Sequence, residues 1–538
     1  MQFSKKHNSD LGESSFRNAC AARQRKALMR LTFCFLVLLW SLSLSVVNQS
    51  LAQDGQQQFT VVVYNVNNLF DGDGVALFDD YQSDKYPPKH LLKKVENIVR
   101  VIAQVEPDGG PHIVLFQEIE ADQTPEGTTK NYDRLLAPFQ EKTLAQMLAE
   151  PFSDQVRDLP AEALLLKALS DAGMGPYHVA AGQYRPDPTG RTVAHINVTF
   201  SKFPIVSSRT HQTSGARGIL EVVHRIADQS LITFNNHWKS EAGNPEAEKV
   251  RIGNAQVLRG RLDQLFQEDP LVDVVVAGDF NSLYNQADLY PKMQPTAING
   301  VLRSQGIEIA LQQTSGPDLY NLWYELPSNQ RGSDVYRGKW GTLMQMIISR
   351  GLYDHRGIQY VDNSFSVAAF QNLNAQAGTG VPIRWQMIDD TAGGYSDHLP
   401  IAAKFRAVRT SQPPGFITLS EPAVTDLASD KQPIDVDYRV VVPANSVRST
   451  EQLGSDIALK NPDNLGHVFR VKAKVSGEKP FRITIFNDEY LVWSFDKEQR
   501  VKLYKTYPVG STAEFLGELG IHKGKWEFLI HDDSWIKP

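Results

Sequence analysis

Residues 59–406 contain a series of apolar runs, and several of them end in polar side chains. The clearest run is Val274–Ala277, which continues into Gly278-Asp279-Phe280-Asn281. An uninterrupted apolar run of this kind predicts a β-strand that is covered on both faces. Asp279 and Asn281 stand two residues apart, so they point the same way if the chain stays extended. A carboxylate and a carboxamide there suit a metal or phosphate site, although Asp, Asn and Gly also favour an ordinary turn.

Other predicted strands carry polar residues in equivalent places. Three of them end in this way: Phe59–Asn65 in Asn65, Ile113–Phe116 in Gln117-Glu118, and Ser230–Asn236 in His237. A Glu that closes a buried strand favours a ligand or salt-bridge role, because an unpaired buried carboxylate is costly. His237 taken alone is open to two interpretations, a hydrogen-bonded structural imidazole or a catalyst.

The Gly-rich segment Gly393–Ser396 is followed by Asp397 and His398, and then by the predicted strand Leu399–Phe405. An adjacent acid and imidazole in a hinged loop indicate an acid/base or metal pair. A surface turn is the alternative.

Helical patterns alternate with these strands. His90–Gln104 places apolar residues at helical spacing, and Pro245–Phe266 does the same; residues 131–172 are also predicted to be helical. Hairpin-like strand pairs interrupt the alternation. The pattern therefore favours an α/β (α+β) fold with mixed sheets and helices outside them.

A Pro/Gly-rich segment, Thr410–Gly415, predicts a linker. Beyond it, residues 446–538 contain short alternating strands, which predict a small all-β sandwich or barrel. Its aromatic residues Tyr490, Trp493 and Tyr504 either pack in the core or form a binding face.

The apolar run Leu31–Val47 follows four basic residues and is followed by Ser50-Leu51-Ala52, a small-x-small cleavage signal. This order predicts a secretory signal peptide that is cleaved after Ala52, and hence a secreted or periplasmic protein. An uncleaved anchor is the alternative, but the run is short for a bilayer. A start at Met29 instead of Met1 would give a compact signal.

Charge and cysteine content restrict the function. The full chain has a formal net charge of −6; without residues 1–52 it has 48 Lys/Arg against 59 Asp/Glu. Such an acidic chain is not a nonspecific nucleic-acid coat, so a phosphate site must be local and assisted by a divalent cation. Cys20 and Cys34 both precede residue 53, so the processed chain has no disulfide framework or zinc cluster.

Five motifs in order resemble the endonuclease/exonuclease/phosphatase superfamily, the deoxyribonuclease-like phosphoesterases. They are Tyr-Asn-Val-Asn-Asn-Leu-Phe-Asp (64–71), Gln-Glu (117–118), Asn-His-Trp-Lys-Ser (236–240), Gly-Asp-Phe-Asn-Ser (278–282) and Ser-Asp-His-Leu-Pro (396–400). The resemblance implies a four-layer sandwich of two mixed β-sheets flanked by helices. We accordingly divide the chain into a signal peptide (1–52), a catalytic domain (53–408), a linker (409–445) and a C-terminal domain (446–538).

The resemblance also implies roles for the residues at the strand ends. Asn65 and Glu118 would hold or orient the metal and the scissile phosphate, and Asp397 would contribute to the metal or orient the neighbouring histidine. The implied metal is Mg²⁺ or Mn²⁺, with Ca²⁺ as a further candidate, and oxygen ligands suit such hard cations.

Four residues are implied to act on the substrate. Asp279 would orient or activate the attacking water, and Asn281 would bind a phosphate oxygen. His237 would serve as the general acid toward the leaving oxygen, and His398 would contact phosphate or act as a base.

One position departs from the family pattern. The family usually has an Asp in the strand after a Trp-containing turn, where it orients the histidine of the last motif. Here that turn is Gly338–Thr342, and the position is Met344, whose thioether is a weak acceptor. Asp389 or Asp390 could substitute, and no carboxylate partner of His237 is evident. If His398 has no other orienter, Met344→Asp should raise the rate.

These observations predict a secreted, metal-dependent phosphoesterase, with a nuclease acting on DNA or RNA as the leading function. A phosphomonoesterase or a phospholipid-type phosphodiesterase is the first alternative. A noncatalytic binding protein that keeps the fold is the second. The sequence has no long apolar hairpin, so we expect no stable membrane insertion after signal cleavage; the oligomeric state stays open.

Overall fold

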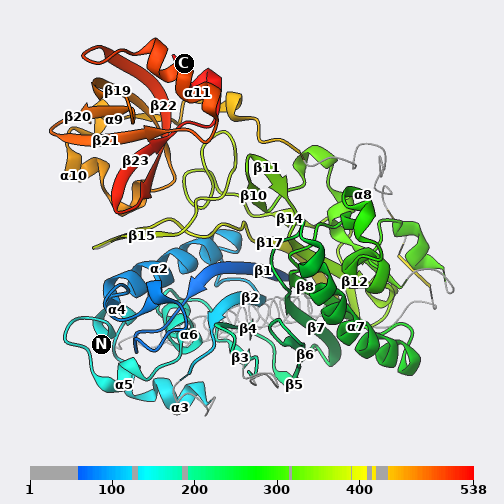
Figure 1. The fold of residues 1–538 in the computed structure, drawn as a ribbon. Coiled ribbons are helices and arrows are strands. Elements are labelled where there is room, and N and C mark those ends of the chain that lie inside the picture. Colours follow the sequence, from blue (N-terminus) through cyan, green and yellow to red (C-terminus); the bar gives the residue numbers. More distant parts are fainter. Residues whose placement is uncertain are drawn as a thin grey trace, which may run out of the picture. The chain divides into compact units, whose positions relative to one another are not determined.

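The structure is a computed structural model. It describes residues 58–123, 131–184, 192–313, 318–388, 390–408, 415–417, 419 and 434–537 (Figure 1). The predicted signal peptide, Cys20, Cys34 and Asp389 lie outside the described residues, as does much of the predicted linker. Among the helices of the described part, none has the length and apolar character needed to cross a membrane.

The first sheet is mixed, with the strand order β13-β17-β1-β2-β4-β3 and β14 paired to β17. β1 and β2 are parallel, and the other pairs are antiparallel. The strands are β1 (Gln58–Leu69), β2 (Ile113–Glu120), β3 (His178–Ala181), β4 (His195–Ser201), β13 (Ile358–Tyr360), β14 (Ser366–Val367) and β17 (Ile401–Ala407).

The second sheet has the order β5-β6-β7-β8-β12-β9. Only β7 and β8 are parallel among its described pairs. The strands are β5 (Ile205–His211), β6 (Ile219–Ile226), β7 (Gln229–His237), β8 (Val274–Asp279), β9 (Leu319–Asn321) and β12 (Met344–Ser349). Together the sheets and their helices confirm the predicted mixed α/β fold.

The two sheets share one apolar core. Val61 and Val63 of β1 lie in the same buried cluster as Val275 and Ala277 of β8. Side chains alternate along a strand, so the intervening residues face outward. The outward Val62 packs with helices of the first sheet, and Val276 packs with helices of the second. Both strands are therefore buried on both faces, as their uninterrupted apolar runs predicted.

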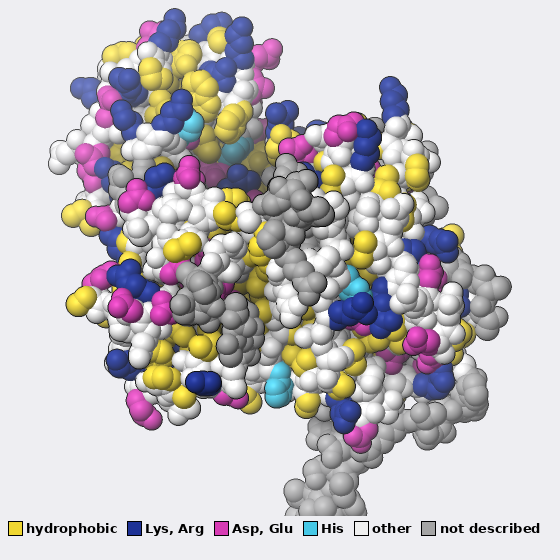
Figure 2. Space-filling model, turned by 60° about the horizontal axis from the view of Figure 1, so that its bottom comes forward, with side chains coloured by type: hydrophobic (Ala, Val, Ile, Leu, Met, Phe, Trp, Pro, Cys, Tyr) yellow, Lys and Arg dark blue, Asp and Glu magenta, His cyan; other side chains and the backbone are white. Residues whose placement is uncertain are grey.

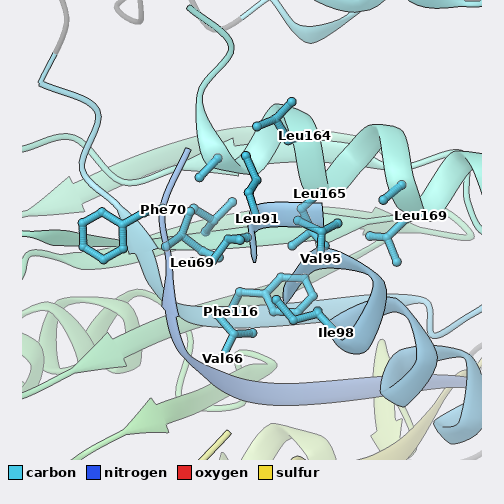
Figure 3. Close-up of a cluster of buried hydrophobic side chains, with 14 of the residues drawn as sticks. Val66, Leu69, Phe70, Leu91, Val95, Ile98, Phe116, Leu164, Leu165 and Leu169 are labelled. Atoms are coloured by element: carbon cyan, nitrogen blue, oxygen red, sulfur yellow. The ribbon is translucent and has the colours of Figure 1, made fainter. Parts of the chain in front are cut away.

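Long helices cover the outer faces of both sheets. Figure 3 shows Val66, Leu69 and Phe116 against side chains of α2 (Pro88–Val105) and α6 (Ala161–Asp171). On the second sheet, α7 (Pro245–Glu268) buries its apolar side chains against β7 and β8. Burial of each large apolar side chain is worth about 1.5–3 kcal/mol, so these contacts hold the strand ends in place.

The predicted helical segment 131–172 is broken into short pieces, which end near Pro138, Pro151 and Pro160. Proline lacks the N–H that a helix interior requires. The remaining elements are α3 (Tyr132–Leu136), α4 (Leu144–Met147), α5 (Asp154–Arg157), α8 (Gln286–Leu289), β10 (Asp334–Tyr336), β11 (Lys339–Gly341), β15 (Gln386–Ile388) and β16 (Thr391–Gly393).

The C-terminal strands follow the order β18-β19-β20-β21-β23-β22, and β19 also pairs with β22. The last pairing closes five of the strands into a ring. The prediction of an all-β domain is wrong, because helix α11 (Lys497–Thr506) lies between β21 and β22 and two short helices precede β19. The elements are α9 (Thr450–Leu453), α10 (Asp456–Leu459), β18 (Arg448–Ser449), β19 (Val468–Gly477), β20 (Arg482–Ile485), β21 (Asp488–Trp493), β22 (Thr512–His522) and β23 (Lys525–Leu529).

A partly buried carboxyl group outside the strand ends predicts a pH effect on stability. Burial, with Glu308 and Asp362 nearby, raises the pKa of Glu325 to about 8. The folded state then holds this proton where the unfolded state has lost it, so stability falls as pH rises from about 4.5 to about 8. Glu325→Gln should reduce this fall by roughly 1–3 kcal/mol, after allowance for solvent screening.

Urea unfolding at pH 5 and pH 8.5 measures the effect, with exposed Glu489→Gln as the control. An unchanged pH dependence in Glu325→Gln would contradict the prediction.

Candidate functional site

Two parallel strand pairs bring the predicted site residues to the same edge of the molecule. Asn65 of β1 pairs with Gln117 of β2, and His237 of β7 pairs with Asp279 of β8. Parallel neighbours end on the same side, so their terminal side chains gather. His398 lies shortly before β17, and β17 pairs with β1.

Glu118 is turned toward this edge by an irregularity in β2. The register of β2 shifts against β1 between Asn65 and Leu69, and against β4 between Phe116 and Ile119. Glu118 has φ 62° at this bulge, a strained conformation that is concentrated at functional sites. The preceding Gln117 is fully buried.

Asn65 links the two carboxylates of the site. Its Nδ2 donates to Glu118 Oε1 at 3.1 Å and to Asp279 Oδ2 at 2.9 Å. Its Oδ1 accepts the N–H of Asn67 at 2.9 Å. Asn65 therefore orients both carboxylates through the hydrogen bonds that its amide nitrogen donates.

Asp279 lies between two imidazoles. Its Oδ2 is 3.7 Å from Nε2 of His237 and 3.7 Å from Nε2 of His398. His237 Nε2 is also 3.8 Å from Glu118 Oε1. Ligand atoms of Glu118, His237 and Asp279 all lie within 4.8 Å of one another. The three residues thus present two oxygens and one nitrogen to a common point.

Asp397 lies at the rim of this group. Its Oδ1 is 3.8 Å from His398 Nε2, and its side chain, 30% exposed, is 3.7 Å from Arg384. The loop that carries Asp397 is fixed by α2, because Lys94 donates to the Tyr395 carbonyl at 2.8 Å and Asn97 to the Gly394 carbonyl at 2.8 Å.

Asn281 does not lie parallel to Asp279, contrary to the sequence expectation. The strand ends at Asp279, and Asn281 has φ 48°, so the chain turns between them. The backbone N–H of Asn281 donates to Asp279 Oδ1 at 2.9 Å, and its side chain donates to the Trp238 carbonyl at 3.2 Å. Asn281 is therefore a support for Asp279 in this structure.

The electrostatics of the two histidines differ. Burial, aided by the charge of Arg217, holds the pKa of His237 well below its usual value. Burial also disfavours charge on His398, but Asp397, Asp279, Asp334 and Glu118 outweigh it and raise its pKa to about 9. The site thus combines a neutral and a charged imidazole near neutral pH.

The acidic residues fit a divalent metal. Burial raises the pKa values of both Glu118 and Asp279, so a neighbouring cation would favour their ionised forms. Their carboxylate oxygens, with those of Asp397 at the rim, are the ligand type that Mg²⁺, Mn²⁺ and Ca²⁺ take. The predicted ligand Asn65 turns its amide nitrogen to the two acids, and its oxygen accepts the Asn67 N–H instead. Two other acidic groups have similar spacing, Asp71/Asp73/Asp122 and Glu308/Glu325/Asp362, but neither contains a histidine.

Sequence reasoning missed two charged residues. The charge of Arg217, just before β6, partly offsets the rise that burial causes in the pKa of Glu118 and of Asp279. Asp334, in β10, forms an antiparallel bridge with His398. Neither belongs to one of the five motifs, and no apolar run ends at either residue.

The expected partners of the histidines are not where the sequence placed them. Met344 is fully buried. Asp390 has a side chain that is 92% exposed and pairs with Lys89, so it is no partner for the buried His398. In the described residues, Nδ1 of His237 has no hydrogen-bond partner.

A sheet edge with buried acids, imidazoles and a carboxamide from separate strands is typical of a catalytic centre. Residues 184–407 match the model of the Endonuclease/Exonuclease/phosphatase family. This match over part of the chain agrees with the resemblance that the five motifs indicated. It includes the last three motifs, whereas the segments 64–71 and 117–118 precede it.

Several solved structures are similar to the chain at low identity. Truncated Caenorhabditis elegans TDP2 is 13% identical, covering 65% of this chain and 98% of that chain, with a TM-score of 0.34. An endonuclease/exonuclease/phosphatase family protein from Leptotrichia buccalis is 13% identical, covering 64% and 98%, with a TM-score of 0.37. ANGEL2, a 2′,3′-cyclic phosphatase, is 13% identical, covering 65% and 96%, with a TM-score of 0.35. Among curated proteins there is no match.

Proposed function

We propose that this protein is a secreted, metal-dependent phosphoesterase, and that its substrate is a phosphodiester of DNA or RNA. Its catalytic domain, residues 53–408, would have the four-layer sandwich of the family. The observation that carries the proposal is the position of Asp279, whose Oδ2 lies 3.7 Å from both His237 and His398. Hydrolysis of a phosphoester needs an aligned water and charge stabilisation around the phosphorus, and this arrangement offers groups for both.

Each residue of the site has a task in this proposal. Glu118 would hold the metal, with Asn65 orienting its carboxylate and Asp397 contributing from the rim. When bound, the metal supplies Lewis-acid stabilisation of the phosphate.

The remaining groups would act on water and substrate. Asp279 would orient the attacking water, and Asn281 would fix that carboxylate through its N–H. The charged form of His398, favoured by the surrounding carboxylates, suits contact with a phosphate oxygen. His237 would face the leaving oxygen from the other side of Asp279.

The surface supports a local phosphate site. On the face shown in Figure 2, acidic side chains lie among the basic ones over much of the described surface. Arg217 is a cation close enough to Glu118 and Asp279 to offset part of the rise that burial causes in their pKa values. An anionic substrate would therefore be recognised at the centre rather than by long-range attraction.

Hydrolysis of bis-(p-nitrophenyl) phosphate and nicking of a plasmid, each with Mg²⁺, Mn²⁺, Ca²⁺ or EDTA, tests the proposal. We expect activity with at least one metal and none with EDTA. Cleavage of the small diester but not of nucleic acid would favour another phosphodiester substrate. Absence of metal-dependent hydrolysis of any phosphoester would leave the noncatalytic alternative.

Arg217 provides a prediction within this site. Arg217→Met should lower kcat/KM by about 10²-fold, because it removes a fixed positive charge beside the reacting phosphate. Arg225→Met, at an exposed position of β6, is the matched control and should leave kcat/KM unchanged. Equal activity of the two variants would contradict the assigned role.

The C-terminal barrel supports nucleic acid as the substrate. Five-stranded barrels of the oligonucleotide/oligosaccharide-binding type use the outer face of their second and third strands, here β20 and β21. β21 ends at Trp493, and Arg500 of α11 lies 4.5 Å from the centre of the Trp493 ring; the nearby Phe495 is 79% exposed. Such aromatic side chains suit stacking with unpaired bases.

Replacing both Trp493 and Phe495 by Ala tests this role. We expect KM for a single-stranded oligonucleotide to rise about tenfold, since stacking contributes roughly 1–3 kcal/mol per base. Hydrolysis of bis-(p-nitrophenyl) phosphate should stay unchanged. Ile457→Ala, at another exposed apolar position, is the control. An unaltered KM in the double variant would exclude this binding face.

A further inference from the structure

His398 has one ring nitrogen without a partner. Its Nε2 faces Asp279 and Asp397, whereas its buried Nδ1 has no hydrogen-bond partner in the described structure. A functional imidazole is normally oriented through the nitrogen that does not face the substrate, by a carboxylate or a carbonyl. The position where the resemblance would place that carboxylate holds Met344.

Asp334 lies beside His398 on a neighbouring segment. The two residues are partners in an antiparallel bridge, and the Leu399 N–H donates to the Ser333 carbonyl at 2.6 Å. Residues directly opposite each other in an antiparallel pair have side chains on the same face, with Cβ atoms about 4.5–5.5 Å apart. The carboxylate of Asp334 is therefore a neighbour of the imidazole.

The surrounding chain fixes this carboxylate in place. Asp334 Oδ1 accepts the Leu343 N–H at 3.1 Å and the Ser333 hydroxyl at 3.1 Å. Opposite it stands Gly341, where a Cβ atom would lie 2.2 Å from Asp334 Oδ2. The site thus reserves space for a buried acid that a larger residue at position 341 would exclude.

We propose that Asp334 is the positioning residue of His398 and replaces the carboxylate that Met344 does not supply. The inference rests on the proposed phosphoesterase activity. It is consistent with the electrostatics. After Asp397 and Asp279, Asp334 also helps to raise the pKa of His398, and the charge of His398 opposes the rise that burial causes in the pKa of Asp334. In this proposal the carboxylate comes from β10 instead of β12, at the residue that is bridged to His398.

Asp334 could instead serve only to stabilise the fold. Asp273 provides a matched control that separates the two roles. Asp273 is also buried and also accepts a backbone N–H, from Ile358 at 2.6 Å, but it precedes the opposite end of β8. We expect Asp334→Asn to lower kcat about 10²-fold, within the range for acid/base assistance, with little change in KM. Asp273→Asn should keep the wild-type kcat even if its melting temperature changes.

Relocating the carboxylate is the decisive experiment. Met344 pairs with Asp279 across β8 and β12, so an acid at 344 would stand on the face that carries Asp279. Met344→Asp in the Asp334→Asn background should recover kcat at least tenfold over Asp334→Asn alone, whereas Met344→Asp alone should not exceed the wild type. This revises the expectation drawn from the sequence, because His398 already has a carboxylate beside it.

The outcomes separate this inference from the proposed function. Wild-type kcat in Asp334→Asn, or no recovery in a folded double variant, would overturn the role of Asp334 while the enzyme assignment stands. If the double variant does not fold, Asp334→Glu replaces it and should retain more kcat than Asp334→Asn; equal losses would overturn the inference. An inactive wild type would instead reject the phosphoesterase proposal itself.

Discussion

Asp279→Asn is expected to lower kcat/KM for phosphodiester hydrolysis by about 10³-fold. The substitution keeps the shape of the side chain but removes the charge that lies between His237 and His398. It also weakens the acceptor for Asn65, whose Nδ2 donates to Asp279 Oδ2 at 2.9 Å. Steady-state kinetics with bis-(p-nitrophenyl) phosphate measures the loss, and the metal concentration is varied to distinguish weaker metal binding from slower turnover.

The control for this prediction is thermal unfolding of the same preparation. Asp279 is an acid whose pKa is raised by burial, so a neutral amide should fold at least as readily. His237→Ala should also abolish turnover, because it removes the group on the other side of Asp279. Near-normal turnover in either folded variant would refute the assigned roles.

Gly278→Ala is expected to have the largest effect on stability, at least about 4 kcal/mol. Gly278 has φ +140°, and a Cβ atom there would lie 2.1 Å from the backbone oxygen of Asn236. β7 and β8 are paired at this point, so neither backbone can move away without loss of the ladder. Urea unfolding measures the change in the free energy of unfolding.

Gly253→Ala is the matched control for that substitution. Gly253 lies within α7, and no atom beyond its chain neighbours and the adjacent helix backbone lies within 4 Å of the position its Cβ would take. Alanine there should stabilise the protein by about 0.5–1 kcal/mol, because glycine is unfavourable inside a helix. A folded Gly278→Ala variant with wild-type stability would contradict the close approach of the two strands.

The sequence was sufficient for the parts of the fold that depend on periodicity. Val274–Ala277 and Phe59–Asn65 are apolar at successive positions, and both lie in strands buried on two faces. The breaks in residues 131–172 and the helix α11 were missed. In the first case apolar content outweighed the prolines, and in the second a polar helix has little apolar periodicity to detect.

The sequence predicted the site residues that stand at the ends of paired strands. It did not predict those that depend on contacts between segments distant in sequence. Parallel pairing brought Asn65 to Glu118 and His237 to Asp279, as the motifs implied. The turn at Asn281 depends on a positive φ that no local pattern demands. Asp334 reaches His398 through a single bridge between segments far apart in sequence, and such a contact leaves no periodic signal.

The bulge at Glu118 restricts how related chains can vary. β2 is paired with β1 and β4 both before and after the shift in register. Exchange of one side chain there disturbs neither ladder, whereas loss of one residue would turn the following part of the strand to the opposite face. Related chains should therefore show substitutions between Phe116 and Ile119, but no insertions or deletions.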